Sequence, residues 1–66
     1  MNITLNGENR PLEGEKTLAE LVESLGLDPR KVAVERNLEI VPRSAYERTD
    51  LANGDRIEIV HFIGGG

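Results

Sequence analysis

The chain contains no cysteine among its 66 residues. It therefore has no disulfide framework, no thiolate nucleophile and no cysteine-based zinc site. Secreted domains of this size usually depend on disulfides, so the absence favours a location in the cytoplasm. The chain does not open with a positive segment followed by an apolar core, and no apolar run approaches membrane-spanning length. We expect neither a signal peptide nor a membrane span.

Positive charge is scarce as well, with 8 basic against 12 acidic residues and a net charge of −4. The lack of a basic stripe disfavours nucleic-acid binding, whereas an acidic surface suits docking on basic partner proteins. The acidic residues show no metal-loop spacing, so we predict no metal site. The phosphate-binding loop pattern of Gly, four residues and Gly-Lys-Ser/Thr is absent, and no ATP site is expected.

Alternating apolar residues predict most of the strands. The first covers residues 1–6 and turns at Asn6-Gly7, where both residues tolerate positive φ. A return strand over 10–13 belongs at a sheet edge, because Pro11 cannot donate a ladder hydrogen bond. Two more strands are expected at 32–35 and 39–41. Leu38 stands where a tight turn prefers glycine, so the turn between these two should be looser.

One main helix is expected after the first hairpin. Thr17 is a good N-cap, Glu20 completes a capping box, and Gly26 is placed to end the helix in the left-handed conformation. Its apolar stripe consists of Leu18, Leu21, Val22 and Leu25. Ser44 with Glu47 resembles a second capping box that opens a short helical turn. The chain therefore predicts a small α+β sheet of four to five strands, with one main helix packed on one face.

The final strand, over residues 56–62, has an unusual outer face. Ile57 and Ile59 should face the core, which places Val60 and Phe62 on the opposite side, just before the tail. We interpret these two residues as a partner-binding patch, because exposed apolar clusters often mark interfaces. His61, the only histidine, is interpreted as structural, since no nucleophile or orienting carboxylate is evident beside it.

The chain ends in Ile63-Gly64-Gly65-Gly66. Glycine has no Cβ, so such a tail can enter a tunnel too narrow for side chains, although a frayed terminus has the same composition. A terminal carboxylate is ionised at neutral pH and is an adequate nucleophile. It can attack the α-phosphate of ATP inside an activating enzyme, after which a sulfur donor can displace AMP and leave a thiocarboxylate.

With these features the sequence resembles the ThiS family of thiamine-biosynthesis sulfur carriers, which are ubiquitin-like β-grasp proteins. The similarity covers the whole chain. It rests on Asn6-Gly7-Glu8, Thr17-Leu18-Ala19-Glu20-Leu21, Val32-Ala33-Val34-Glu35 with Asn37, Ile40-Val41-Pro42-Arg43, Asn53-Gly54-Asp55-Arg56-Ile57-Glu58-Ile59-Val60, and His61-Phe62-Ile63-Gly64-Gly65-Gly66.

The resemblance implies one β-grasp domain over residues 1–66, with a flexible tail at 63–66 and a mixed sheet whose first and last strands are parallel and central. It implies that the protein is not an enzyme but a substrate of partner enzymes. Gly66 would be adenylated by an E1-like ThiF-type adenylyltransferase that uses ATP and magnesium, and Ile63, Gly64 and Gly65 would thread into the partner's active site. Sulfur would come from a cysteine-desulfurase persulfide, and the Gly66 thiocarboxylate would deliver it to a ThiG-type thiazole synthase.

Other functions remain open from the sequence. The small subunit of molybdopterin synthase shares the fold and the chemistry, although those chains are usually longer. A ubiquitin-like protein modifier would share the activation step, and a β-grasp interaction module with an inert tail would need none of it. The size of the chain argues against a free-standing enzyme, because we expect little room for a deep active-site cavity.

Overall fold

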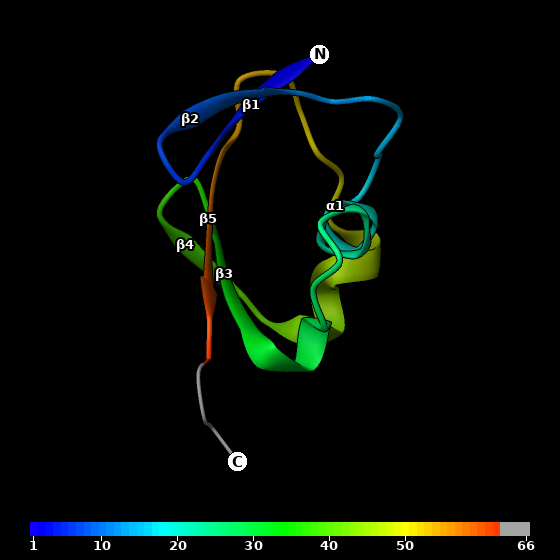
Figure 1. The fold of residues 1–66 in the computed structure, drawn as a ribbon, viewed down its shortest axis with the longest axis vertical. Helices are drawn as coiled ribbons and strands as arrows, with labels where there is room; N and C mark the ends of the chain where they lie inside the picture. The colour runs from blue at the N-terminus through cyan, green and yellow to red at the C-terminus, as the bar shows by residue number, and fades with distance from the viewer. Residues whose placement is uncertain (63–66) are drawn as a thin grey trace.

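The computed structural model describes residues 1–62, in which a five-stranded mixed sheet packs against one α-helix (Figure 1). The strand order is β2-β1-β5-β3-β4. The elements are β1 (Asn2–Leu5), β2 (Glu8–Pro11), α1 (Leu18–Ser24), the 3₁₀ helix η1 (Pro29–Lys31), β3 (Val32–Arg36), β4 (Glu39–Val41), the 3₁₀ helix η2 (Arg43–Arg48) and β5 (Arg56–His61). None of the helices in residues 1–62 is long and apolar enough to cross a membrane.

The two central strands come from opposite ends of the described chain. β1 and β5 run parallel, and every other neighbouring pair is antiparallel. This confirms the predicted mixed sheet and the predicted edge position of Pro11, which lies in β2. The return strand begins at Glu8 rather than at Arg10, because Asn6 (φ 50°) and Gly7 (φ 83°) form a two-residue turn that lets pairing resume at once.

The helix cap follows the sequence signal with one difference. The Thr17 hydroxyl oxygen accepts from the N–H of Glu20 at 3.2 Å, as predicted. In a capping box the glutamate accepts from the N–H of the cap residue itself, but here Glu20 accepts from Lys16, one residue earlier, at 2.6 Å. Gly26 follows the helix with φ 73°, so the predicted left-handed ending is confirmed.

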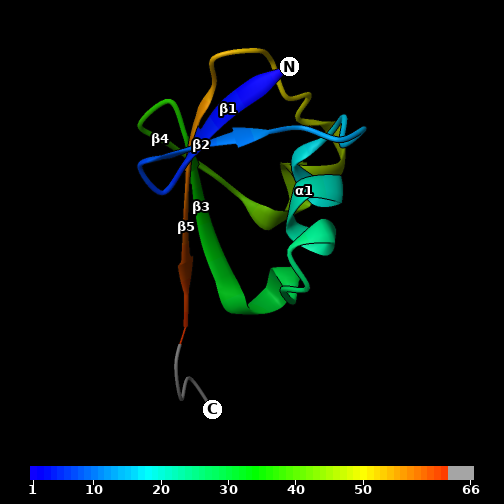
Figure 2. The same ribbon diagram turned by 45° about the horizontal axis from the view of Figure 1, so that its top comes forward.

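The core lies between the inner face of the sheet and the layer formed by α1 and η2, which both views place on the same side (Figures 1 and 2). Ile57 and Ile59 point into it from β5, in agreement with the predicted alternation. The remaining buried apolar side chains are Ile3, Leu18, Leu21, Val22, Val32, Val34, Tyr46 and Leu51. The opposite, outer face of the sheet carries no helix among the described residues.

The predicted second capping box is wrong. η2 begins at Arg43 with Pro42 in the cap position, and no side chain caps it. Ser44 is therefore already inside the helix, where its side chain cannot reach the first free N–H groups. The fixed φ of proline, −67° here, directs the chain into the first turn instead.

The predicted loose turn between β3 and β4 is also wrong. Asn37 (φ 53°) and Leu38 (φ 72°) form a two-residue turn with both residues in the left-handed region, and Arg36 pairs directly with Glu39. The register of the two strands and the hydrogen bonds of Asn37 to β5 hold Leu38 in a conformation that its Cβ disfavours.

Leu38→Gly is therefore expected to stabilise the fold by about 0.5–1 kcal/mol, because glycine adopts positive φ without a Cβ clash. Little burial is lost, since the Leu38 side chain is 69% exposed. Thermal unfolding should show a rise of the midpoint by a few degrees. Leu38→Ala keeps the Cβ and should give no comparable gain; a gain as large as that of glycine would show that the backbone of Leu38 is not strained.

Candidate functional site

The outer face of β5 is apolar at its end. Val60 is 61% exposed and Phe62 is 52% exposed, while their neighbours Ile57 and Ile59 are buried. Large apolar side chains exposed in a chain this small are unusual when they adjoin one another. The structure thus places both predicted patch residues on the open face, directly before residue 63.

Two residues that the sequence did not single out extend this surface. Ala33 on β3 lies directly opposite Val60, and Ile40 on β4, 78% exposed, lies opposite Glu35. We call Ala33, Ile40, Val60 and Phe62 the outer-face patch. A shallow hollow of about 310 Å³ lies over part of it, between β3, β4 and β5. The patch is therefore shared by three strands rather than confined to β5.

Two carboxylates lie beside the patch on the same face. Glu35 on β3 and Glu58 on β5 are directly opposite each other, and both border the hollow. Like charges in directly opposed positions destabilise a sheet. Arg56 approaches Glu58 at 3.8 Å on the exposed surface, which offsets little of this repulsion. A partner that brings a basic side chain between the two glutamates would relieve it.

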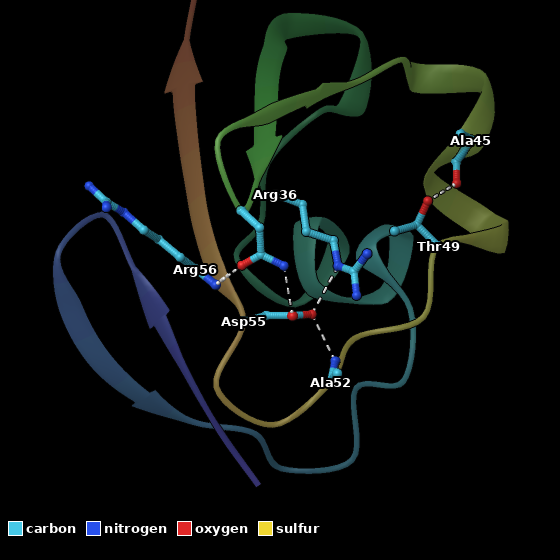
Figure 3. Close-up of polar contacts among 7 residues, drawn as sticks. Arg36, Ala45, Thr49, Ala52, Asp55 and Arg56 are labelled. Atoms are coloured by element: carbon cyan, nitrogen blue, oxygen red, sulfur yellow. Dashed lines mark hydrogen bonds and ion pairs between the residues drawn. The ribbon is translucent and has the colours of Figure 1, made fainter.

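A polar cluster fixes the beginning of β5 (Figure 3). Asp55 is only 5% exposed. It accepts from Arg36 Nε at 2.9 Å, from Asn37 Nδ2 at 3.1 Å and from the N–H of Ala52 at 2.8 Å. Asn37 Oδ1 in turn accepts from the N–H of Arg56 at 2.9 Å. The cluster joins the β3–β4 turn to the first residues of β5 and so sets where β5 begins.

Burial and hydrogen bonding act in opposite directions on Asp55. Burial alone would raise the pKa of the Asp55 carboxyl group. The hydrogen bonds from Ala52, Arg36 and Asn37, together with the charge of Arg36, outweigh it and hold the pKa below its ordinary value. Asp55 is therefore a carboxylate at neutral pH, with a structural role at the far end of β5 from the tail.

Asn6 makes hydrogen bonds to the middle of β5, at Ile57 and Ile59. Its N–H donates to the carbonyl oxygen of Ile57 at 2.9 Å. Its side-chain amide then bonds to the next inward residue, accepting from the Ile59 N–H at 2.8 Å and donating to the Ile59 carbonyl at 3.3 Å. The amide group of Asn6 thus replaces the peptide group of a neighbouring strand. The sequence marked Asn6 only as a turn residue, because nothing local reveals a contact with residue 59.

The other predicted site residues, Ile63, Gly64, Gly65 and Gly66, lie outside the described residues. His61 is exposed at the end of β5, and no side-chain hydrogen bond involves it within residues 1–62. In the same part of the chain no group of three or more His, Cys, Asp or Glu side chains could hold a metal ion.

A hollow of about 620 Å³ lies between α1 and η2, on the other side of the molecule from the outer-face patch. Its volume is within the range of ligand pockets. Its lining mixes the acidic Glu23 and Glu47 with the basic Arg30 and Arg43. Of these four, Arg30 has a raised pKa, through its hydrogen bond to Asp28, and this stabilises the ordinary charged form.

Comparison with known proteins identifies the family. The ThiS family model matches residues 3–66. The chain belongs to the ThiS family. The Sulfur carrier protein ThiS of Bacillus subtilis is 40% identical over 65 residues, which cover 97% of this chain and 98% of that protein. The ThiS crystal structure from Geobacter metallireducens superimposes with a TM-score of 0.83 at 35% identity and covers all of both chains. The predicted family and β-grasp fold are confirmed.

A second kind of relative contains a segment that is similar to this chain. A thiazole synthase of Paramagnetospirillum magneticum is 53% identical over 66 residues. A thiazole synthase of Magnetococcus marinus is 52% identical over the same length. The alignments cover all of this chain but only a fifth of each relative, so the similarity concerns one segment of a longer protein.

Proposed function

We propose that this ThiS-family chain carries sulfur for thiazole formation in thiamine biosynthesis, on the terminal carboxyl group of Gly66. As a member of this family it is a carrier protein rather than an enzyme, and its chemistry is supplied by partners. The observation that carries the proposal is the match of the ThiS family model to residues 3–66. It is supported by the exposed apolar surface at the end of β5, directly before residue 63.

The proposed cycle begins with activation. A carboxylate oxygen of Gly66 attacks the α-phosphate of ATP, pyrophosphate leaves, and an acyl-adenylate forms. Magnesium and ATP are bound by an E1-like, ThiF-type adenylyltransferase. The terminal sulfur of a persulfide, formed by a cysteine desulfurase, then attacks the acyl carbon and AMP leaves. Cleavage of the sulfur–sulfur bond by a thiol yields the thiocarboxylate. Because activation consumes ATP, we propose the cytoplasm as the compartment.

Thiazole synthase is the proposed acceptor of the sulfur. Support comes from the two thiazole synthases that each contain a segment similar to this whole chain. Two proteins that act on each other are often found joined in one chain, because a link raises their effective concentration. Ile63, Gly64 and Gly65 are proposed to thread into the partner's active site, where the small glycines give the reacting carboxyl group access.

The outer-face patch is the proposed docking surface for these partners. Its apolar side chains adjoin the residue that precedes the tail, so a partner bound there would hold the tail at a fixed place. The opposed Glu35 and Glu58 favour a partner surface that combines apolar and basic side chains. A mainly apolar patch bordered by charge is the usual composition of such interfaces.

Phe62→Asp is expected to weaken binding of the ThiF-type enzyme by about tenfold or more, since a charge would replace an apolar contact within the proposed interface. Isothermal titration calorimetry with the purified enzyme measures the change. Leu38→Asp is the matched control, because it adds the same charge to an exposed leucine beside the opposite end of β5. Equal affinity of Phe62→Asp and the wild type would exclude Phe62 from the interface.

Intact-mass analysis tests the proposed function itself. The protein is incubated with the ThiF-type enzyme, ATP, magnesium and a persulfide source. The expected product has one terminal oxygen replaced by sulfur. Absence of this species with an enzyme that activates another ThiS protein would refute the carrier function. Covalent adducts on other proteins after incubation with cell extract and ATP would support a protein modifier instead.

A further inference from the structure

The backbone of β5 bonds to its two neighbours through alternate residues. Toward β3, the N–H of Phe62 donates to the carbonyl of Lys31 at 2.8 Å, and the carbonyl of Arg56 accepts from Asn37 at 2.7 Å. In an antiparallel pair this pattern recurs at every second residue, so positions 56, 58, 60 and 62 face β3. Positions 57, 59 and 61 therefore direct their N–H and carbonyl groups to the other side, toward β1.

On the β1 side, β5 extends beyond the last residue that bonds to it. Ile57 is bonded by Asn6 and Ile59 by the side-chain amide of Asn6. β1 stops at Leu5, and the chain turns away at Asn6-Gly7 into β2. His61 is the next residue on this edge, and within residues 1–62 no group bonds to its N–H or carbonyl on the β1 side.

The outer edges of the sheet are protected in ways that this inner edge is not. The β2 edge contains Pro11, and the β4 edge is only three residues long. Proline and short length are common means of preventing a sheet from adding another strand. The β5 edge at His61 has neither, and Val60 and Phe62 lie beside it as exposed apolar side chains.

We propose that an extended segment of the activating ThiF-type enzyme adds to β5 at His61, in line with β1, and pairs with the main chain there. This proposal rests on the proposed function and states how the partner would hold the chain. The added segment carries apolar side chains toward Val60 and Phe62, and a basic side chain toward Glu58.

His61→Pro tests this pairing without disturbing the fold. Proline removes the N–H that faces the β1 side, and it leaves the bonds of β5 to β3 intact because His61 lies in a non-bonded pair with Val32. His61→Ala is the matched control, since it removes the imidazole and keeps the N–H. The affinity of His61→Pro for the ThiF-type enzyme is expected to be about fivefold to tenfold lower than that of His61→Ala, the effect of one or two hydrogen bonds.

A second variant tests whether the loss of affinity comes from the missing N–H or from the fixed φ of proline. A synthetic chain with an ester in place of the peptide bond between Val60 and His61 lacks the same N–H and keeps an ordinary φ. It should show the same loss of affinity. Amide hydrogen exchange at His61 in the wild type should be fast in the free protein and slow in the complex. Unchanged affinity of the ester chain, or fast exchange in the complex, would overturn the proposal.

Further measurements on the same variants distinguish the other possible occupants of this edge. Sedimentation that shows a wild-type dimer abolished by His61→Pro would assign the edge to a second copy of this chain and overturn the proposal. If His61→Pro and the ester chain bind the ThiF-type enzyme as tightly as His61→Ala and all of them receive sulfur, strand addition fails while the carrier function stands. If even the wild type receives none, it is the proposed function that fails.

Discussion

Gly65→Val is expected to abolish formation of the Gly66 thiocarboxylate while leaving the fold intact. A β-branched side chain adds bulk next to the reacting carboxyl group and restricts the backbone on either side of it. A displacement of about 1 Å at a reacting centre can cost on the order of a hundredfold in rate. Mass analysis after incubation with the ThiF-type enzyme, ATP and a persulfide source would measure the loss.

Two companion variants sharpen this test. Gly65→Ala adds a single methyl group and should retain partial activation, and deletion of Gly66 should lose activation as fully as Gly65→Val. The fold should be unaffected in all of them, since the buried core extends only from Ile3 to Ile59. A chain that still forms the thiocarboxylate at the wild-type rate would show that residue 65 does not pass through a narrow site.

Asp55→Ala is expected to have the largest effect on stability, a loss of about 3 kcal/mol, because the guanidinium of Arg36 and the N–H of Ala52 would lose a charged acceptor. Arg36 is partly exposed, so water compensates some of this loss. A domain of this size has a small total stability, and this change would remove much of it. Urea unfolding, monitored by circular dichroism, measures the difference.

Asp50→Ala is the matched control for Asp55→Ala. It removes an aspartate that is exposed and whose side chain makes no hydrogen bond within residues 1–62. Its free energy of unfolding should stay within about 0.5 kcal/mol of the wild type. A similar loss in both variants would mean that Asp55 contributes through net charge alone and not through its cluster.

The lowered pKa of Asp55 adds a dependence on pH. Since the carboxylate is favoured in the folded state, its contribution is complete above the unfolded-state pKa of about 3.9 and is lost as pH falls through the lower, folded-state value. Below about pH 4 the wild type should therefore approach Asp55→Ala in stability. A constant difference from pH 7 down to pH 2 would contradict the assigned role of this cluster.

Sequence periodicity predicted the parts of the fold that depend on local pattern. The alternation from Ile57 to Phe62 assigned each side chain to its face, and Thr17 with Gly26 marked the helix. The errors arose where tertiary contacts overrule local preference. Leu38 adopts a left-handed conformation because the strands on either side are already paired, and Pro42 takes the cap position that Ser44 was expected to hold.

The candidate site was only partly predictable for the same reason. Val60 and Phe62 lie on a strand long enough to show a period, whereas β4 has three residues and gives no reason to place Ile40 on the outer face. The contacts of Asn6 with Ile59, and of Arg36 with Asp55, join residues 53 and 19 positions apart. Such pairs become visible only when the order of the strands is known.

The central position of β5 decides when the sheet can be completed. β5 lies between β1 and β3, so each of these strands has only one of its two neighbours until residues 56–61 have been synthesised. A chain interrupted before that point has no continuous sheet, and its outer-face patch lacks Val60 and Phe62. Because β1 pairs with β5, the sheet cannot be completed until residues 56–61 have been synthesised. A partner that docks on the outer-face patch would therefore bind only chains in which β5 has taken its place in the sheet.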